Sequence, residues 1–211
     1  RRVLFRSGLL PPSDGRGHVA GINISSEPHR LRARIGYMSQ RFSLYSDLTA
    51  AENLAFFAHA YGLGRSRRRA AIEWARDMTG LADAPDRPAG HLSGALRQRL
   101  ALACSILHRP AVLFLDEPTS GVDPEARSRF WRLIDSLADA GATVLVTTHY
   151  LAEAAFCHRL ALMHDGRLIA SGALATLRAG LGAAAPESAE DIFLAHIQLA
   201  QERADRSIEV S

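Results

Sequence analysis

Residues 112–123 read VLFLDEPTSGVD, and this stretch decides the fold. Its first four residues are all apolar, and they lead directly into Asp116 and Glu117. A short apolar run bounded by polar residues is consistent with a buried strand. Open α/β sheets bind their ligands beyond the carboxyl ends of the strands. The two carboxylates therefore stand where a ligand site is expected.

The sequence on both sides of this strand alternates between strand and helix patterns. Apolar strands separated by helices indicate a parallel sheet covered on both faces, so we predict an α/β fold. Asp165 and Gly166 predict the turn of a hairpin over residues 163–170. The other expected elements are strands over 19–24, 35–38, 143–147 and 160–163, and helices over 27–34, 124–140, 151–156 and 191–203.

A mostly helical block is expected over about residues 49–107. Thr49 and Glu52 have the spacing of a capping box, and an apolar helical face continues from there. Residues 62–64, Gly-Leu-Gly, interrupt the block. The arginine-rich residues 65–69 that follow are most simply a solvated helix start. The block thus separates two strands of the sheet.

Ser93 and Gly94 stand at the start of a predicted helix. Ser93 suits the N-cap, and Gly94 leaves the first N–H groups of the helix open to an anion such as phosphate. Taken alone, this motif is more often a plain capped helix than an anion site. Its place before the strand and the Asp116-Glu117 pair favours the phosphate interpretation. In nucleotide hydrolysis, one carboxylate holds Mg²⁺ through water and the next polarises the attacking water.

In this order, residues 92–98, 112–117 and 118–123 resemble the signature motif, Walker B strand and D-loop of ABC ATPases. Gln40 is similar to the Q-loop glutamine and His149 to the switch histidine. The resemblance extends from residue 8 to about 180. It implies a P-loop NTPase-like (RecA-like) parallel sheet with an inserted helical subdomain over about 49–107. Four segments resemble ABC-2-type multidrug exporter subunits, in particular the second ATP-binding domain of tandem members: 35–45, 119–124, 129–131 and 147–154.

The resemblance also implies that two such domains enclose two ATP molecules head to tail. Ser93 and Gly94 then contact the γ-phosphate held by the opposite domain. Asp116 supports Mg²⁺ and Glu117 is the general base. Ala95 stands where the motif usually has a second glycine, and we expect it to be tolerated if it is already helical.

Three further roles follow from the resemblance. Gln40 senses the metal ion and the attacking water, and His149 stabilises the γ-phosphate. Asp123 links the two sites across the interface between the domains. The segment 41–48 either faces a membrane-spanning ABC-2-type permease subunit or packs its apolar side chains into the core.

The 25 cationic residues are all arginine, so the sequence contains no P-loop lysine. We therefore expect the Walker A region to be missing through N-terminal truncation, and the fragment alone to be inactive. Residues 1–7, RRVLFRS, read like a translated sequencing adapter; the alternative is a genuine basic helix start. Without its three arginines, 22 positive residues balance 22 negative ones, which removes the compositional support for a nucleic-acid partner.

We expect an ATP-binding domain over residues 8–182, followed by a linker and C-terminal helix over 183–211. No stretch approaches the roughly 20 apolar residues of a membrane span, so we expect a cytoplasmic protein. Its predicted place is the cytoplasmic face of the plasma membrane, bound to the permease. A soluble ABC ATPase is disfavoured because the helical block is short and lacks a coiled-coil insertion. Intact Gln40, Glu117 and His149 argue against a non-hydrolysing regulatory domain.

Overall fold

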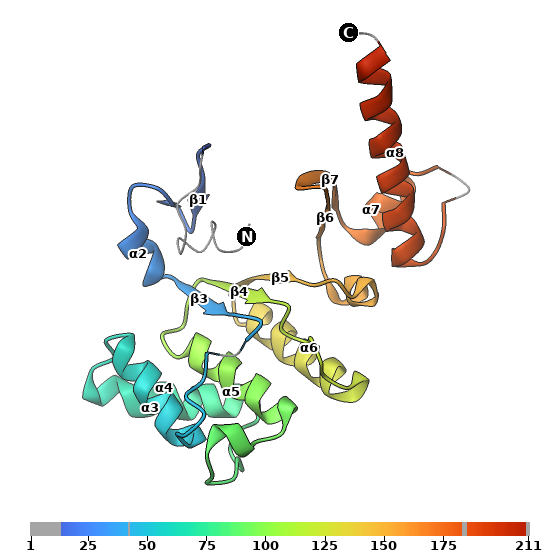
Figure 1. The fold of residues 1–211 in the computed structure, drawn as a ribbon. Coiled ribbons are helices and arrows are strands. Elements are labelled where there is room, and N and C mark those ends of the chain that lie inside the picture. Colours follow the sequence, from blue (N-terminus) through green and yellow to red (C-terminus); the bar gives the residue numbers. More distant parts are fainter. Residues whose placement is uncertain (1–13, 42, 183–184, 210–211) are drawn as a thin grey trace. The chain divides into compact units, whose positions relative to one another are not determined.

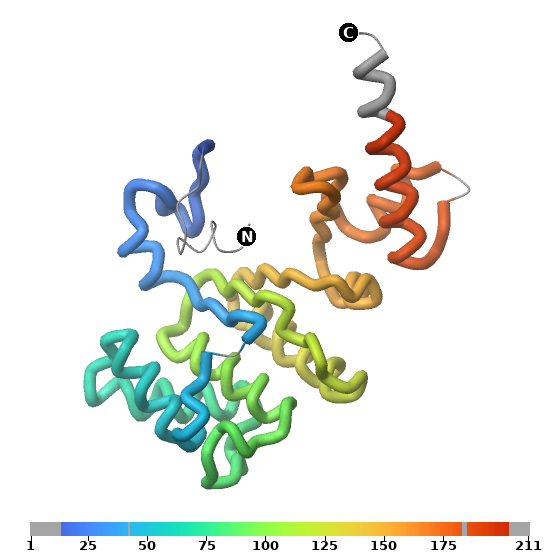
Figure 2. Tube along the Cα trace, viewed as in Figure 1, coloured from blue at the N-terminus to red at the C-terminus, as the bar shows by residue number. Residues whose placement is uncertain are grey.

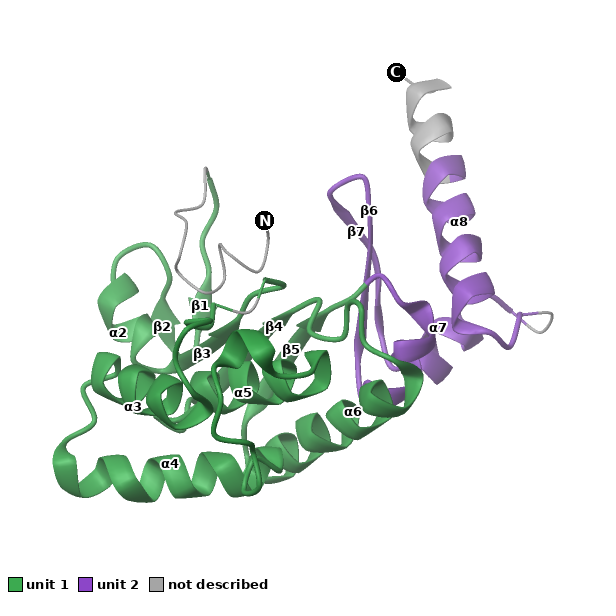
Figure 3. Cartoon of the chain, turned by 60° about the horizontal axis from the view of Figure 1, so that its bottom comes forward, with its two compact units in different colours: residues 1–148 green, residues 149–211 purple. Residues whose placement is uncertain are grey.

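The computed structural model describes residues 14–41, 43–182 and 185–209. It divides the chain into two compact units, Arg1–Thr148 and His149–Ser211, which Figure 3 draws in green and purple. Each unit is described by itself below. The heptapeptide at residues 1–7 lies outside the described residues.

Unit 1 is built on a three-stranded parallel sheet (Figure 1). Its strands are β3 (Ile35–Met38), β4 (Val112–Asp116) and β5 (Thr143–Thr147), with β4 in the middle. The register pairs Ile35 with Val112 at one end and Asp116 with Thr147 at the other. The predicted parallel sheet is confirmed, and its central strand delivers the carboxylates.

The two faces of this sheet pack against different elements. On one face, Ile35 and Phe114 form a core with Ile22 and with Leu31 of α2 (Pro28–Arg32). The other face packs against α5 (Gly94–Ile106), which approaches the sheet at Gly36. A Cβ built on Gly36 would lie 2.4 Å from the carbonyl oxygen of Ser105, so no other residue fits there without a shift. This glycine sets how closely α5 covers the sheet.

The predicted strand over residues 19–24 is wrong as a single element. The structure has a small antiparallel hairpin there, β1 (His18–Val19) and β2 (Ile22–Asn23). The chain turns at Ala20 and Gly21, which have φ angles of 50° and 75°. Glycine adopts this left-handed conformation at little cost, so the chain can reverse at Gly21. The apolar residues on either side had indicated one continuous strand.

The helical block contains α3 (Ala50–Ala60), α4 (Arg65–Thr79), the 3₁₀ helix η1 (Ala89–His91) and α5. Figure 2 follows these helices through the teal and green part of the chain. The predicted capping box of Thr49 and Glu52 is present. Asn53 is fully buried, and its amide bonds the backbone of the segment before α3 at Tyr45, Leu48 and Thr49. This buried amide anchors residues 45–49 to the block.

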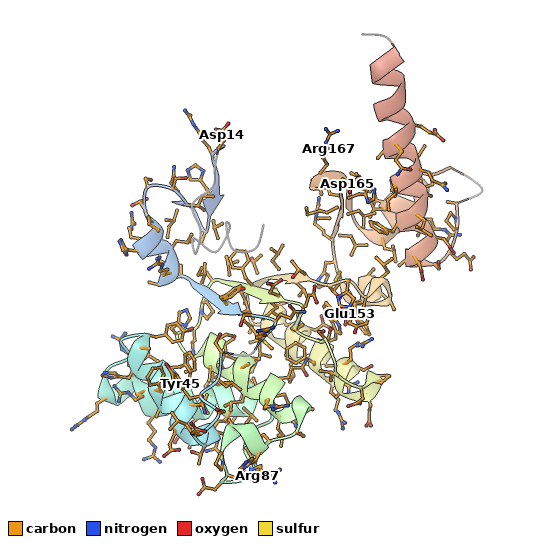
Figure 4. The ribbon with its side chains drawn as sticks, viewed as in Figure 1. Asp14, Tyr45, Arg87, Glu153, Asp165 and Arg167 are labelled. Atoms are coloured by element: carbon orange, nitrogen blue, oxygen red, sulfur yellow. The ribbon has the colours of Figure 1, made fainter. Side chains whose placement is uncertain are left out.

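Helix α6 (Pro124–Asp139) completes unit 1 between β4 and β5. Unit 2 holds η2 (Leu151–Phe156), β6 (Leu160–His164), β7 (Arg167–Gly172), α7 (Leu174–Ala179) and α8 (Ala189–Glu209). The helix expected over 151–156 is a 3₁₀ helix, and α7 was not predicted. The Asp165-Gly166 turn is confirmed at the tip of the antiparallel β6–β7 hairpin, where Figure 4 labels Asp165. Helix α8 is longer than the expected 191–203.

Candidate functional site

The first carboxylate is held by the two strands that flank β4. Asp116 ends β4, and the Thr147 hydroxyl of β5 donates a 2.5 Å hydrogen bond to its Oδ1. From β3, the Tyr37 hydroxyl donates to Oδ2 at 3.5 Å. Burial of the ring raises the pKa of Tyr37, and the charge of Asp116 and its hydrogen bond to the hydroxyl raise it further. Both oxygens of Asp116 are therefore oriented by neighbouring strands.

The second carboxylate lies at a sharp bend of the backbone. Glu117 has a φ of 46°, a left-handed conformation that non-glycine residues rarely adopt. Its N–H donates to the Thr147 carbonyl at 3.0 Å, which fixes the bend against β5. Its Oε2 accepts a 2.8 Å hydrogen bond from Nε2 of Gln40, which follows β3. The structure thus joins Gln40 to Glu117, the residue that follows Asp116 in the chain.

The turn after Glu117 leads into α6. The Ser120 N–H donates to the Glu117 carbonyl at 3.2 Å, and the Pro118 carbonyl accepts from buried Gln98 of α5 at 2.7 Å. Asp123 ends the turn as the N-cap of α6, accepting from the Ala126 N–H at 2.9 Å. Within this chain Asp123 therefore has a capping role, and its proposed role between domains stays a prediction.

The signature residues form the start of α5. Ser93 is the N-cap, and its hydroxyl accepts from the Leu96 N–H at 3.3 Å. A Cβ built on Gly94 meets no described atom within 4 Å, so this helix end is sterically open. Ala95 lies inside α5 and is not among the described residues with positive φ. The condition under which we expected Ala95 to be tolerated is therefore met.

His149 opens unit 2, two residues after the end of β5. Its ring lies 4.2 Å from the Tyr150 ring, measured between centroids, with the planes tilted by 37°. The predicted site residues are thus distributed over four places: the carboxyl edge of the sheet, the start of α5, the start of α6, and the first residue of unit 2. At the sheet edge, a hydrogen bond joins Gln40 directly to Glu117.

Sequence reasoning did not assign the two side chains that hold Asp116. Thr147 follows an apolar run, and parallel strands end at the same sheet edge, so register alone was a usable signal for it. Tyr37 gave no such signal, because an aromatic residue inside a short strand is ordinary core composition. Its hydroxyl reaches Asp116 only because β3 and β4 pair in this register.

The donor set at this edge suits a hard cation. Asp116 and Thr147 offer carboxylate and hydroxyl oxygens, the type of ligand that Mg²⁺ takes in proteins. Among the described residues, no group of three or more His, Cys, Asp or Glu side chains forms a metal cage. Mg²⁺ commonly binds through one or two carboxylates together with substrate phosphates, so a single acidic ligand fits this ion.

Both the sequence and the fold of this chain are similar to those of known proteins. The family profile described as ABC transporter matches residues 4–120. The chain belongs to the ABC transporter family. Solved members share the fold: the structure of an ATP-binding subunit of an ABC transporter has a TM-score of 0.79 at 25% identity, covering 93% of this chain and 82% of its own. The family assignment also confirms the predicted P-loop NTPase-like fold.

Curated relatives in this family are named for multidrug transport and for drug resistance. The probable multidrug ABC transporter ATP-binding protein YbhF of Escherichia coli K12 is 44% identical over 172 residues, 82% of this chain and 30% of YbhF. The daunorubicin/doxorubicin resistance ATP-binding protein DrrA of Streptomyces peucetius is 42% identical over 175 residues, 82% of this chain and 53% of DrrA. The chain thus spans about a third to a half of these relatives. Within the described residues, no helix is both long and apolar enough to cross a bilayer.

Proposed function

We propose that this chain binds and hydrolyses ATP to drive substrate export, as the nucleotide-binding subunit of an ABC-2-type transporter. The observation that carries the proposal is the Gln40–Glu117 hydrogen bond of 2.8 Å, directly beside an Asp116 oriented by Thr147. A solved dimeric ATP-binding cassette bound to ADP and Pi supports it, with a TM-score of 0.71 at 25% identity, covering 82% of this chain and 78% of its own. YbhF is named as part of a probable multidrug ABC transporter and DrrA for resistance to daunorubicin and doxorubicin, and these names support the export role.

In this proposal Glu117 accepts the proton of the water that attacks the terminal phosphate. The amide of Gln40 orients the Glu117 carboxylate, because its Nε2 donates to one carboxylate oxygen. Asp116 holds Mg²⁺, whose charge offsets that of the phosphates when it is bound. ADP and phosphate are the products. His149 stabilises the charge that develops on the terminal phosphate.

The start of α5 serves a second nucleotide in this proposal. The open N-terminus at Ser93 and Gly94 presents N–H donors and the positive end of a helix, which suits a phosphate. A second ATP-binding domain, in another copy or in tandem, brings its nucleotide to this end. Ala95 lies in the first turn beside them, and Asp123 lies at the same interface between domains.

A membrane-spanning permease is the other proposed partner, and we propose that the chain lies on the cytoplasmic face of the plasma membrane. Tyr45 and Phe56 are 47% and 44% exposed, and their rings meet edge to face with centroids 4.4 Å apart. Figure 4 shows Tyr45 on the helical block. Leu44 instead lines a small pocket against Tyr37 and Phe57, so the segment 41–48 sends one side chain inward and one outward. An exposed aromatic pair, in which buried Asn53 anchors the Tyr45 backbone, suits a protein interface.

The experiment uses the complete protein with its membrane subunits and measures ATP turnover against Mg²⁺ concentration. We expect Mg²⁺-dependent turnover that Asp116→Asn lowers by about 100-fold, because the neutral side chain holds the ion weakly. The control is Asp139→Asn, an exposed carboxylate in the last turn of α6 that contacts neither site. Equal turnover in Asp116→Asn and Asp139→Asn contradicts the assignment.

A simpler test uses the 211 residues alone. Because they contain no lysine, we propose that they lack the phosphate-binding loop and bind ATP too weakly to function. Addition of millimolar ATP and Mg²⁺ is then expected to leave the melting temperature unchanged. A clear ATP-dependent rise in the melting temperature contradicts this part of the proposal.

A further inference from the structure

Helix α5 carries a buried glutamine that the proposed function does not yet use. Gln98 lies in the second turn of α5 and is 1% exposed. Its Nε2 donates a 2.7 Å hydrogen bond to the Pro118 carbonyl, twenty residues further along the chain. A buried amide that loses its partner is costly, so this contact is strongly favoured once the core has formed. The contact ties α5 to the turn that follows Glu117.

That turn has little freedom to move by itself. Glu117 is held in a left-handed conformation by the Thr147 carbonyl, and the Ser120 N–H closes the turn onto the Glu117 carbonyl. Proline has a fixed φ and no N–H, so the carbonyl of Pro118 is its one backbone hydrogen-bonding group. Gln98 occupies this group. A shift of α5 is therefore transmitted through this hydrogen bond to Pro118 and to the adjacent backbone of Glu117.

We propose that Gln98 is a positioning residue that keeps the general base Glu117 aligned with the signature residues Ser93 and Gly94. This inference rests on the proposed function, in which Glu117 acts on the nucleotide of its own domain. Ser93 and Gly94, at the start of the same helix as Gln98, contact the nucleotide held by the second domain. Gln98 thus links, within one chain, the parts that serve two different nucleotides.

This role predicts a specific kinetic signature. Gln98 is buried behind the turn and is not among the groups assigned to ATP contact, so its loss leaves ATP affinity unchanged. The orientation of Glu117 toward the attacking water is lost instead, which lowers kcat. Binding at one site also no longer aligns the base of the other site. The dependence of rate on ATP concentration therefore becomes less cooperative.

The experiment compares two variants of the complete protein with its membrane subunits. Gln98→Met keeps the length of the side chain but cannot donate to the Pro118 carbonyl. The matched control, Ser105→Ala, removes another buried hydrogen bond of α5, from the Ser105 hydroxyl to the Leu102 carbonyl at 2.7 Å, and leaves the turn intact. Both variants are expected to lower the melting temperature. ATP turnover is measured against ATP concentration for each.

We expect Gln98→Met to lower kcat about tenfold with KM within about twofold of wild type, and to bring the Hill coefficient toward one. Ser105→Ala should keep all three values. A Gln98→Met protein with wild-type kcat and Hill coefficient overturns the inference, as does a rise in KM alone. A wild-type protein without ATP turnover contradicts the proposed function instead, so the two failures differ.

A second variant covers the case in which Gln98→Met does not fold. Gln98→Asn retains an amide but is one methylene too short to keep the same reach to Pro118. We expect a kcat loss of about threefold or more with KM unchanged, because the amide is only partly misplaced. A folded Gln98→Asn protein with wild-type kcat and cooperativity overturns the inference by itself.

Discussion

The carboxyl edge of the sheet and the start of α5 are built in different ways. Asp116 and Glu117 are oriented by Tyr37, Gln40 and Thr147, which come from the strands on either side or just beyond them. The start of α5 is organised by local contacts, chiefly the bond from the Leu96 N–H to the Ser93 hydroxyl three residues away. The first region depends on tertiary register, and the second on local sequence.

This difference determines which sequence changes disturb each region. A change that displaces the strands or α5 disturbs the carboxylates, even when it lies far from them in sequence. The start of α5 tolerates such changes better, because its cap forms within one helical turn. Conversely, the helix end is open, so a small added group there affects a ligand more than the fold.

The largest effect is expected for Gly36→Ala, which attacks the packing under the carboxyl edge. The new Cβ would lie 2.4 Å from the Ser105 carbonyl oxygen and 2.7 Å from Cδ1 of Leu113. Backbone of α5 has to move, so we expect a loss of about 3 kcal/mol in the free energy of unfolding, measured by urea denaturation. Gly64→Ala is the control, since a Cβ there meets no described atom within 4 Å. Equal losses in both variants would show that α5 is not packed this tightly.

The next effect is expected for Thr147→Val, which keeps the shape of the strand but removes the hydroxyl that donates to Asp116 and accepts from the Glu117 N–H at 3.3 Å. Asp116 Oδ1 loses its 2.5 Å hydrogen bond, at a cost of about 1–2 kcal/mol in unfolding free energy. Under the proposed function, the Mg²⁺ concentration for half-maximal turnover also rises. Thr143→Val, at the exposed start of the same strand, should change neither quantity. If both variants behave alike, the Thr147 hydroxyl does not orient the carboxylate.

The next prediction is for Gly94→Ala, which tests whether the start of α5 serves a ligand rather than the fold. Because a Cβ meets no described atom there, the free energy of unfolding should stay within about 0.5 kcal/mol of wild type. A methyl group would stand where a phosphate approaches the first N–H groups, so ATP turnover should fall about tenfold. Unfolding and turnover are measured on the same preparation. Unchanged turnover would leave α5 as a plain capped helix.

The smallest effect is expected for the pH dependence of stability, through His108, which lies two residues beyond the end of α5. His108 donates from Nε2 to the Ile35 carbonyl at 2.8 Å, and its Nδ1 is buried with no hydrogen-bond partner among the described residues. Burial lowers the pKa of His108 below its ordinary value of 6.5, although the Ile35 bond opposes this. Near pH 6 the unfolded chain therefore binds more protons at His108 than the folded chain does. The contribution of His108 to the free energy of unfolding is fully present above about pH 6.5, and it is lost as the pH falls through the folded-state pKa.

We expect this contribution to stay under about 1 kcal/mol, since the ring is partly exposed and solvent screens its charge. Urea denaturation at pH 7.5 and pH 5 measures it. His108→Gln should flatten the difference between the two pH values, whereas His91→Gln, at an exposed position, should not. A His108→Gln protein with the wild-type pH dependence would place the responsible group elsewhere.

The parts of the site that the sequence predicted are those with local signals. Ser93 precedes a helix, and Asp116 and Glu117 follow an apolar run, so each reports its surroundings through its neighbours in the chain. Outside the site, the Asp165-Gly166 turn was predictable from its local sequence in the same way. Gln40, His149 and Asp123 came from family resemblance rather than from pattern. Gln40 now has a structural partner in Glu117, and the role of Asp123 between domains stays a prediction.

The missed features depend on contacts distant in sequence. Tyr37 and Asp116 are 79 residues apart, and Gln98 and Pro118 are 20 apart, so neither contact leaves a local periodic pattern. The split of the predicted strand at residues 19–24 has the opposite cause. There a local turn at Ala20 and Gly21 overrode the apolar composition of the segment.

The most direct test of the account is ATP turnover and ATP binding by the Glu117→Gln variant of the complete protein. The substitution keeps the size of the side chain but removes the group that accepts the proton. We predict a loss of at least about 100-fold in turnover, with ATP affinity within about twofold of wild type. The matched control, Glu125→Gln in the exposed first turn of α6, should behave as wild type. Near-normal hydrolysis by Glu117→Gln would contradict the account.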